Sequence, residues 1–271
     1  AGLINFSTNE PDEAFFTSVK LSGGEFGTQT AGVVLNVPIS EKFLSRFVFE
    51  SHESDGYVEN DFQDSNTTND RDELTSRAKF SWQVKKNWSL NLSLASIDID
   101  NGYDAFSLDN NRHTLSDEPG FDRQNSAYVS LKSSWQLDGM NIDVLWNQSD
   151  SDLDYGYDED WSYTGIHPWG YTSTDHYFRK RDTTSAEIRL LSNESSRVFA
   201  DTTDWVLGLY YLRSSEALQR QYTFLPSDFL SDYEFDTFAI FTQLDVALSD
   251  RMTLSAGLRL EERDTEYGDS D

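Results

Sequence analysis

Residues 238–261 read FAIFTQLDVALSDRMTLSAGLRLE, two strand-like arms around a short turn at Ser249-Asp250-Arg251. In the second arm, apolar and polar side chains alternate strictly from Met252 to Glu261. A period of two places the apolar side chains on one face of an extended strand, whereas a helix would need apolar residues three and four apart. This stretch therefore predicts an antiparallel β-hairpin with one apolar face and one polar face.

Five such hairpins follow one another, and a first strand at about residues 14–21, after a short leading segment, brings the total to eleven strands. The connections within the hairpins are mostly short, and the connections between them are long, acidic and aromatic. We place the long loops at residues 54–72, 101–123, 150–182 and 217–233. Short turns at one end and long loops at the other are typical of an outer-membrane barrel. We therefore predict an all-β fold, an antiparallel transmembrane β-barrel portion whose strands meander in sequence order.

The composition is compatible with this prediction. The 271 residues carry a formal net charge of -27, which argues against binding of nucleic acid because phosphate contacts need clustered Lys and Arg. The aromatic content of 14% argues against disorder. No apolar run reaches the length of a transmembrane helix, but a transmembrane strand needs only about 9–11 alternating residues. The chain has no cysteine, which excludes disulfides and thiol catalysis.

Bulky aromatic residues gather near the short turns. Amphipathic rings prefer the membrane–water interface, so a ring of them at one end of the strands predicts an interfacial girdle. The alternative is that these rings close off the core of a soluble β-sandwich. The predicted girdle residues are Phe43, Trp82, Trp88, Trp135 and Trp205.

The N-terminal segment Gly2-Leu3-Ile4-Asn5-Phe6-Ser7-Thr8-Asn9-Glu10-Pro11 resembles the G-x-I-N-x-x-T-x-x-P sequence that ends the plug domain of TonB-dependent outer-membrane receptors. Residues 107–123 are similar to loop sequences of these receptors. Residues 256–260 resemble their recurrent aGlRy strand, with Leu260 in place of the usual aromatic residue. The resemblance rests on five plug-end positions, Gly2, Ile4, Asn5, Thr8 and Pro11.

The resemblance implies that residues 1–12 are the C-terminal end of a plug and residues 13–271 the N-terminal part of a 22-stranded plugged barrel. Eleven strands without a TonB box lead us to expect an interior piece of a longer protein. The resemblance also implies a place in the outer membrane of a Gram-negative bacterium, in contact with its lipid. The implied function is uptake of a scarce nutrient, foremost a ferric siderophore, energised by the TonB–ExbB–ExbD complex. A passive porin or adhesin barrel and a soluble β-sandwich that binds carbohydrate remain alternatives.

No motif predicts an enzyme, a cofactor or a metal site. Residues 150–161 fail the EF-hand pattern, because Tyr155 stands where glycine is needed and Trp161 where the bidentate glutamate belongs. The four histidines lack ligand spacing. The longest predicted loop is instead rich in aromatic residues, which offer rigid contact area for a ligand or pack the loops against one another. The ligand-binding residues predicted there are Tyr155, Tyr157, Trp161, Tyr163, His167, Trp169 and Tyr171, with His176 beside them.

Overall fold

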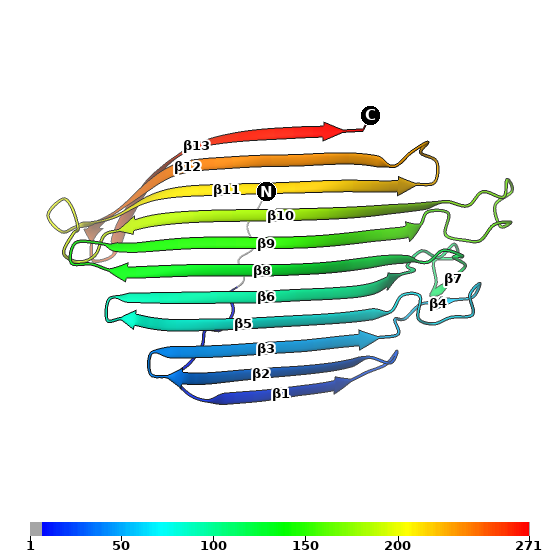
Figure 1. Cartoon of the computed structure of the whole chain (residues 1–271), viewed down its shortest axis with the longest axis horizontal. Helices are drawn as coiled ribbons and strands as arrows, with labels where there is room; N and C mark the ends of the chain where they lie inside the picture. Colours follow the sequence, from blue (N-terminus) through cyan, green and yellow to red (C-terminus); the bar gives the residue numbers. More distant parts are fainter. Residues whose placement is uncertain (1–6, 271) are drawn as a thin grey trace.

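A computed structural model of the chain describes residues 7–270, which form one large antiparallel sheet (Figure 1). Its eleven strands lie in sequence order, β1-β2-β3-β5-β6-β8-β9-β10-β11-β12-β13, and each pairs with the next. The predicted meander of eleven strands is therefore confirmed. The strands are β1 (Phe16–Gly23), β2 (Gln29–Ser40), β3 (Phe43–Ser54), β5 (Arg71–Lys85), β6 (Trp88–Tyr103), β8 (Gly120–Gln136), β9 (Asn141–Asp158), β10 (Thr174–Leu191), β11 (Thr203–Tyr222), β12 (Phe229–Ser249) and β13 (Met252–Asp269).

The connections alternate between the two ends of the sheet, and the three longest, residues 55–70, 104–119 and 159–173, lie at the same end (Figure 1). One end holds the turns at residues 41–42, 86–87, 137–140, 192–202 and 250–251. The other end holds the connections at residues 24–28, 55–70, 104–119, 159–173 and 223–228. Two of these loops meet through a short parallel pair, β4 (Glu59–Asn60) with β7 (His113–Thr114). No helix in residues 7–270 is long and apolar enough to cross a membrane.

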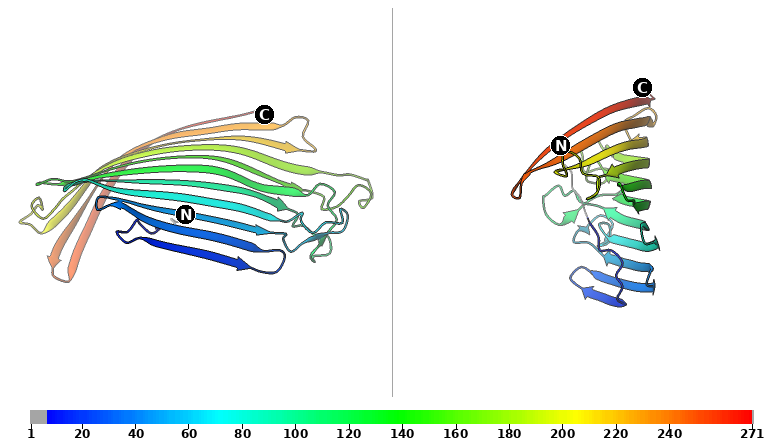
Figure 2. Two further views of the ribbon diagram at one scale, coloured as in Figure 1. Left: turned by 60° about the horizontal axis from the view of Figure 1, so that its bottom comes forward. Right: turned by 90° about the vertical axis from the view of Figure 1, so that its left-hand side faces the viewer.

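The sheet is strongly curved, and the segment before β1 lies on its concave side (Figure 2). β1 and β13 are its two edges. No second sheet packs on it, and among the described residues the only buried apolar side chains are Val58 and Ala239. The two packed sheets of a soluble sandwich are therefore not present in residues 7–270.

Cross-strand register shows which side chains share a face, because directly paired residues of an antiparallel ladder point to the same side. One transverse row runs from Phe43 on β3 to Leu260 on β13, and eight of its nine residues are apolar. The row is Phe43, Trp82, Leu90, Ser133, Val144, Ile188, Leu209, Ile240 and Leu260. These side chains lie on the convex face, where five of the apolar ones are exposed, as with Trp82 at 46%, and Ser133 is buried.

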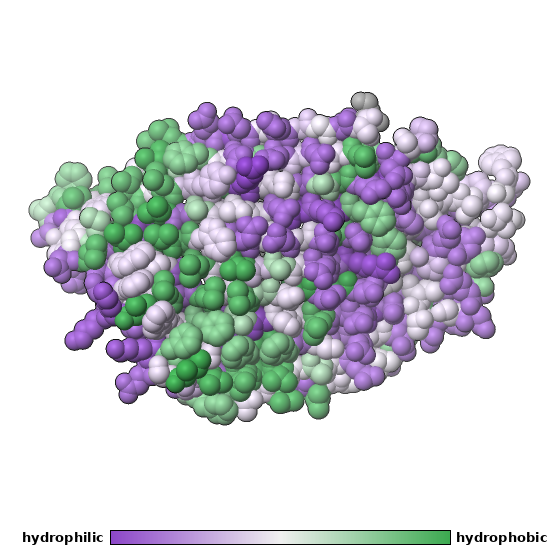
Figure 3. All heavy atoms as spheres, in the orientation of Figure 1, coloured by the Kyte–Doolittle hydropathy of each residue, from purple (hydrophilic) through white to green (hydrophobic). Residues whose placement is uncertain are grey.

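A row three residues further along the strands, on the concave face, is polar. It contains a single aliphatic residue, Leu212, and the rest carry hydroxyl, amide or charged groups. The row is Arg46, Lys79, Ser93, Ser130, Asn147, Ser185, Leu212, Thr237 and Arg263. The convex surface seen in Figure 3 is apolar toward the short turns and hydrophilic toward the long loops.

Four strands, β9 to β12, run further than the hydropathy pattern predicts. The predicted loop 150–182 is in fact residues 159–173, and the predicted loop 217–233 is residues 223–228. Beyond the apolar rows both faces are polar, so the alternation in hydropathy disappears while the backbone ladder continues. Cross-strand ion pairs such as Arg181 with Glu216 support this extension.

Candidate functional site

The loop ends of β9, β10 and β11 bring five polar and aromatic side chains together on the concave face. Tyr155 on β9 pairs with Tyr177 on β10, which pairs with Arg220 on β11. Two residues nearer the loops, Tyr157 on β9 pairs with Asp175 on β10. We call these five residues the tyrosine–arginine patch. The strands position it because odd-numbered residues of β9 and β10 continue the concave polar rows beyond the apolar band.

Asp175 is the centre of the tyrosine–arginine patch and is only 2% exposed. Its carboxylate accepts hydrogen bonds from Arg220 Nε at 2.8 Å and Nη2 at 2.7 Å, and from the Tyr177 hydroxyl at 2.9 Å. Burial opposes ionisation of this carboxyl, but the hydrogen bonds from Arg220 and Tyr177 outweigh it and lower the pKa of Asp175. The patch therefore contains a fixed carboxylate whose charge is balanced by a guanidinium.

The tyrosines of the patch remain hydrogen-bond donors. Burial raises the pKa of Tyr155, Tyr157 and Tyr177 above the ordinary value, so their hydroxyls stay protonated. The Arg179 guanidinium lies 5.2 Å from the centre of the Tyr177 ring, and that of Arg220 lies at the same distance. The result is a surface of neighbouring tilted rings, hydroxyl groups and two cations, which suits a ligand with anionic or oxygen-rich groups.

Some of the predicted loop residues join this surface. The Trp161 ring stacks on Phe106 with centroids 5.0 Å apart, and Phe106 lies 5.8 Å from Tyr157. The ring of Tyr103 also contacts that of Tyr155, with centroids 5.0 Å apart. Tyr155 and Tyr157 are not loop residues as predicted but belong to β9, because that strand continues beyond the apolar rows.

The other residues predicted to bind a ligand lie apart from the tyrosine–arginine patch. Tyr163 stacks on Phe62 of a neighbouring loop at 4.6 Å, and His167 contacts Tyr171 at 4.7 Å. Trp169 is 88% exposed. His176 pairs with Gly156 and so points to the convex face, away from the patch.

Sequence reasoning missed Tyr177, Arg179, Arg220, Asp175 and Phe106. Three of these are on β10 and two on other segments, and only the register of β9, β10 and β11 brings them beside the predicted tyrosines. The alternation of Tyr155 and Tyr157 with small or acidic residues was the available signal. It shows that β9 continues, but it does not identify the partners across the strands.

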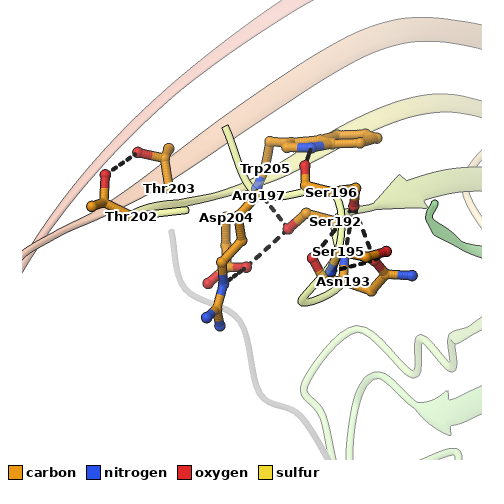
Figure 4. A network of polar contacts seen from close by, with 9 residues as sticks. All are labelled: Ser192, Asn193, Ser195, Ser196, Arg197, Thr202, Thr203, Asp204 and Trp205. Carbon is orange, nitrogen blue, oxygen red and sulfur yellow. Dashed lines mark hydrogen bonds and ion pairs between the residues drawn. The ribbon is translucent and has the colours of Figure 1, made fainter. Parts of the chain in front are cut away.

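The predicted girdle residues lie on the convex face near the short turns. Phe43 contacts Trp82 edge to face at 6.5 Å, and Trp88 stacks on Trp135 at 5.9 Å. Trp205 is held separately: its indole Nε1 donates to the Ser196 carbonyl at 2.9 Å (Figure 4). All five therefore lie at one end of one face, and their place at a membrane interface stays a prediction.

The turn that holds Trp205 is fixed by a polar network (Figure 4). The backbone N–H of Trp205 donates to Ser192 Oγ at 3.0 Å, and Ser192 Oγ donates to Asp204 Oδ1 at the same distance. Arg197 Nε also donates to Asp204 Oδ1, at 2.9 Å. This network compensates for a strained backbone, since residues 199–201 all have positive φ.

Of the predicted plug-end residues, Gly2, Ile4 and Asn5 lie outside the described residues. The Thr8 carbonyl accepts a hydrogen bond from Lys79 Nζ at 3.1 Å, and the same ammonium pairs with Glu10 at 2.6 Å. Pro11 follows in the same segment. The segment thus crosses the polar concave face and is tied to it by a mostly buried cation.

No group of three or more His, Cys, Asp or Glu side chains in residues 7–270 is arranged to hold a metal ion. Acidic side chains are nevertheless buried where the loops meet. Burial raises the pKa of Asp158 to about 6. The Asp104 carboxylate accepts hydrogen bonds from Asn60, Thr68 and Thr114, each at 2.7 Å, which ties the loops together.

No protein-family model matches the chain. Several solved structures, in contrast, have a similar fold. The ferric yersiniabactin uptake receptor FyuA from Yersinia pestis superposes with a TM-score of 0.80 at 16% identity, covering 97% of this chain and 41% of that one. The ferric-catecholate import receptor Fiu from E. coli K12 gives 0.73 at 12% identity, covering 96% and 46%. The ferripyoverdine receptor of the outer membrane of Pseudomonas aeruginosa gives 0.72 at 13% identity, covering 96% and 38%.

These neighbours are TonB-dependent siderophore receptors, so the resemblance read from the sequence is confirmed for the fold. Residues 7–270 have the architecture of part of the barrel wall of such a receptor. The chain spans less than half the length of the structures that it matches.

Proposed function

We propose that the chain belongs to an outer-membrane receptor that takes up a scarce nutrient, with a ferric siderophore as the first ligand class to test. The observation that carries the proposal is a pair of rows across the sheet, three residues apart along the strands, the convex one mostly apolar and the concave one mostly polar. A row of exposed aliphatic and aromatic side chains suits hydrocarbon, and a polar concave row suits a hydrated lumen. The shared fold with siderophore receptors supports the same orientation.

In this proposal, the tyrosine–arginine patch and the adjoining loop rings make the first contacts with the ligand. Ferric siderophores are bulky and rich in oxygen donors, and many carry negative charge. Arg179 would attract that charge, and the Tyr155 and Tyr177 rings would offer rigid contact area beside it. Binding of this kind involves no covalent step, so the activity is transport rather than catalysis.

Residues 1–12 would be the end of the plug and residues 13–271 part of the barrel around it. The TonB–ExbB–ExbD complex would supply energy through the plug, and the girdle residues would lie at the lipid interface. The ion pair between Lys79 and Glu10 supports contact between the two parts.

Growth under iron limitation tests the proposal. A strain that lacks its own siderophore receptors and expresses the whole protein should grow on at least one ferric siderophore from a panel, and only when TonB is functional. Arg179→Gln should weaken binding of that siderophore several-fold, while Arg123→Gln, an exposed arginine on the opposite face, should not. Growth that persists without TonB would favour a passive porin instead.

A further inference from the structure

A pocket of about 330 Å³ lies on the concave face, where the segment before β1 passes over the sheet (Figure 2). It is lined by three cations, Arg46 on β3 and Arg77 and Lys79 on β5, and by residues 7–9 of the segment. Arg46 pairs directly with Lys79, and Arg77 is two residues away from Lys79 on the same strand. The three positive side chains therefore share one face and lie close together.

The segment is anchored to the sheet at two points, so the pocket is formed before any ligand arrives. The side-chain amide of Asn36, which is fully buried, donates to the carbonyls of Asp12 at 2.8 Å and Ala14 at 2.7 Å. Its Oδ1 accepts from the Asp12 N–H at 2.9 Å. Further along, Lys79 Nζ donates to the Thr8 carbonyl at 3.1 Å.

Protein carboxylates balance only one of the three charges. Glu10 pairs with Lys79 at 2.6 Å. Within residues 7–270, neither Arg46 nor Arg77 forms an ion pair or a side-chain hydrogen bond. Glu50, the nearest acid along β3 on this face, is paired with a lysine at 3.4 Å. Like charges directly opposite each other destabilise a sheet, and a bound anion would remove that repulsion.

The remaining lining groups suit an anion made of oxygen atoms. Ser7, Thr8 and Asn9 contribute hydroxyl and amide groups, and in residues 7–270 their side chains have no hydrogen-bond partner. A guanidinium presents its N–H donors as a planar fork that matches carboxylate and phosphate oxygens. The volume is at the lower end of the range of ligand pockets, which favours a small group.

We propose that this pocket binds an oxyanion from solution, a carboxylate or phosphate group, between Arg46 and Arg77. The residue of β9 in the same row as Arg46 is Asn147, and Tyr155 of the tyrosine–arginine patch is eight residues further along that strand. Eight residues correspond to about 26 Å of strand, so this is a separate site nearer the short turns. In an uptake receptor, it would give an anionic nutrient a second contact on the concave face.

The test uses the whole protein in detergent micelles, titrated with sodium phosphate while sodium chloride keeps the ionic strength constant. We expect phosphate to slow backbone hydrogen exchange in residues 7–14 in a saturable way, as measured by mass spectrometry. Chloride at the same ionic strength should not slow it. No ferric ligand is involved, so this inference can fail while the proposed function stands, and the reverse.

Two variants and a matched control decide the outcome. Arg46→Gln and Arg77→Gln should each weaken phosphate binding about tenfold, because each removes a charge-assisted hydrogen bond. Arg46→Gln should also slow exchange in residues 7–14 without phosphate, since it removes the charge opposite Lys79. Arg189→Gln, on the same face but paired with Glu187, should leave phosphate binding unchanged.

Two results would overturn the proposal. One is a wild-type protein in which phosphate has no saturable effect, as when a carboxylate from another part of the whole protein already occupies the pocket. The other is an equal phosphate affinity in the wild type, Arg46→Gln and Arg77→Gln. The wild-type titration decides the first even if a variant does not fold.

Discussion

An arginine placed on the convex face should cost far more than the same arginine placed on the concave face of the same strand. Leu209 lies in the apolar row, 41% exposed, and Leu212 is the one aliphatic residue of the polar row. Leu209→Arg and Leu212→Arg are therefore matched changes three residues apart on β11. If the strand crosses a bilayer as proposed, only the first puts a guanidinium into hydrocarbon.

The position of Leu209 along β11 determines how much free energy Leu209→Arg should cost. Leu209 is four residues from Trp205 on one side and four from Arg213 on the other, about 13 Å of strand in each direction. With the usual tilt of roughly 40°, this is about 10 Å of depth on either side, so Leu209 lies near the middle of the apolar band. Arginine at the midplane of a barrel costs about 2–4 kcal/mol. That is about 30-fold to 700-fold in the folding equilibrium.

The assay is a urea titration of folding into lipid vesicles with the whole protein, with the folded fraction read from the heat-dependent shift in gel mobility. Leu212→Arg should cost less than about 1 kcal/mol, because it joins Ser185 and Thr237 in a polar row. If Leu212→Arg costs as much as Leu209→Arg, the assignment of the two faces is wrong.

Two further predictions concern the loop end. Arg220→Gln leaves the buried Asp175 carboxylate without its cation and should destabilise the loop end by about 1–3 kcal/mol in hydrogen exchange, whereas Arg123→Gln, which breaks an exposed pair, should be nearly neutral. The hydrogen bond that His113 donates to the Asp61 carboxylate raises the pKa of His113, so an NMR titration should give a midpoint above 6.5 that falls in Asp61→Asn. Because the folded pKa is raised, this pair stabilises the loops fully below pH 6.5 and loses its effect as the pH rises through the folded value.

The fold could be predicted because the alternation is local. Each hairpin carries its own turn, and in Met252 to Glu261 every second residue shows which face it belongs to. The ends of the strands could not be predicted in the same way. Above the apolar rows, residues such as Asp150 and Ser151 are polar on both faces, so the sequence no longer distinguishes a strand from a loop.

The site was only partly predictable, for a related reason. Tyr155 and Tyr157 could be singled out because aromatic residues cluster around them, but Arg220 is 65 positions beyond Tyr155 in the sequence. It joins the patch only because β9, β10 and β11 are paired in one register over their full lengths. A shift of one residue in either pairing would turn its side chain to the opposite face.

Part of the chain's large negative charge lies at a fixed level along the strands, toward the end that holds the long loops. On the convex face, the row six residues beyond Ile188 contains Asp182, paired with Asp150, and continues to Glu234. Six residues correspond to about 20 Å of strand. Carboxylates do not remain charged in hydrocarbon, so in the proposed outer-membrane setting this acidic row lies just beyond the apolar band that ends near Arg213, and the girdle marks the opposite limit. Acidic residues of the loop end would therefore serve two purposes: those on the convex face set the depth of the sheet, and the buried Asp104 ties the loops together through its hydrogen bonds.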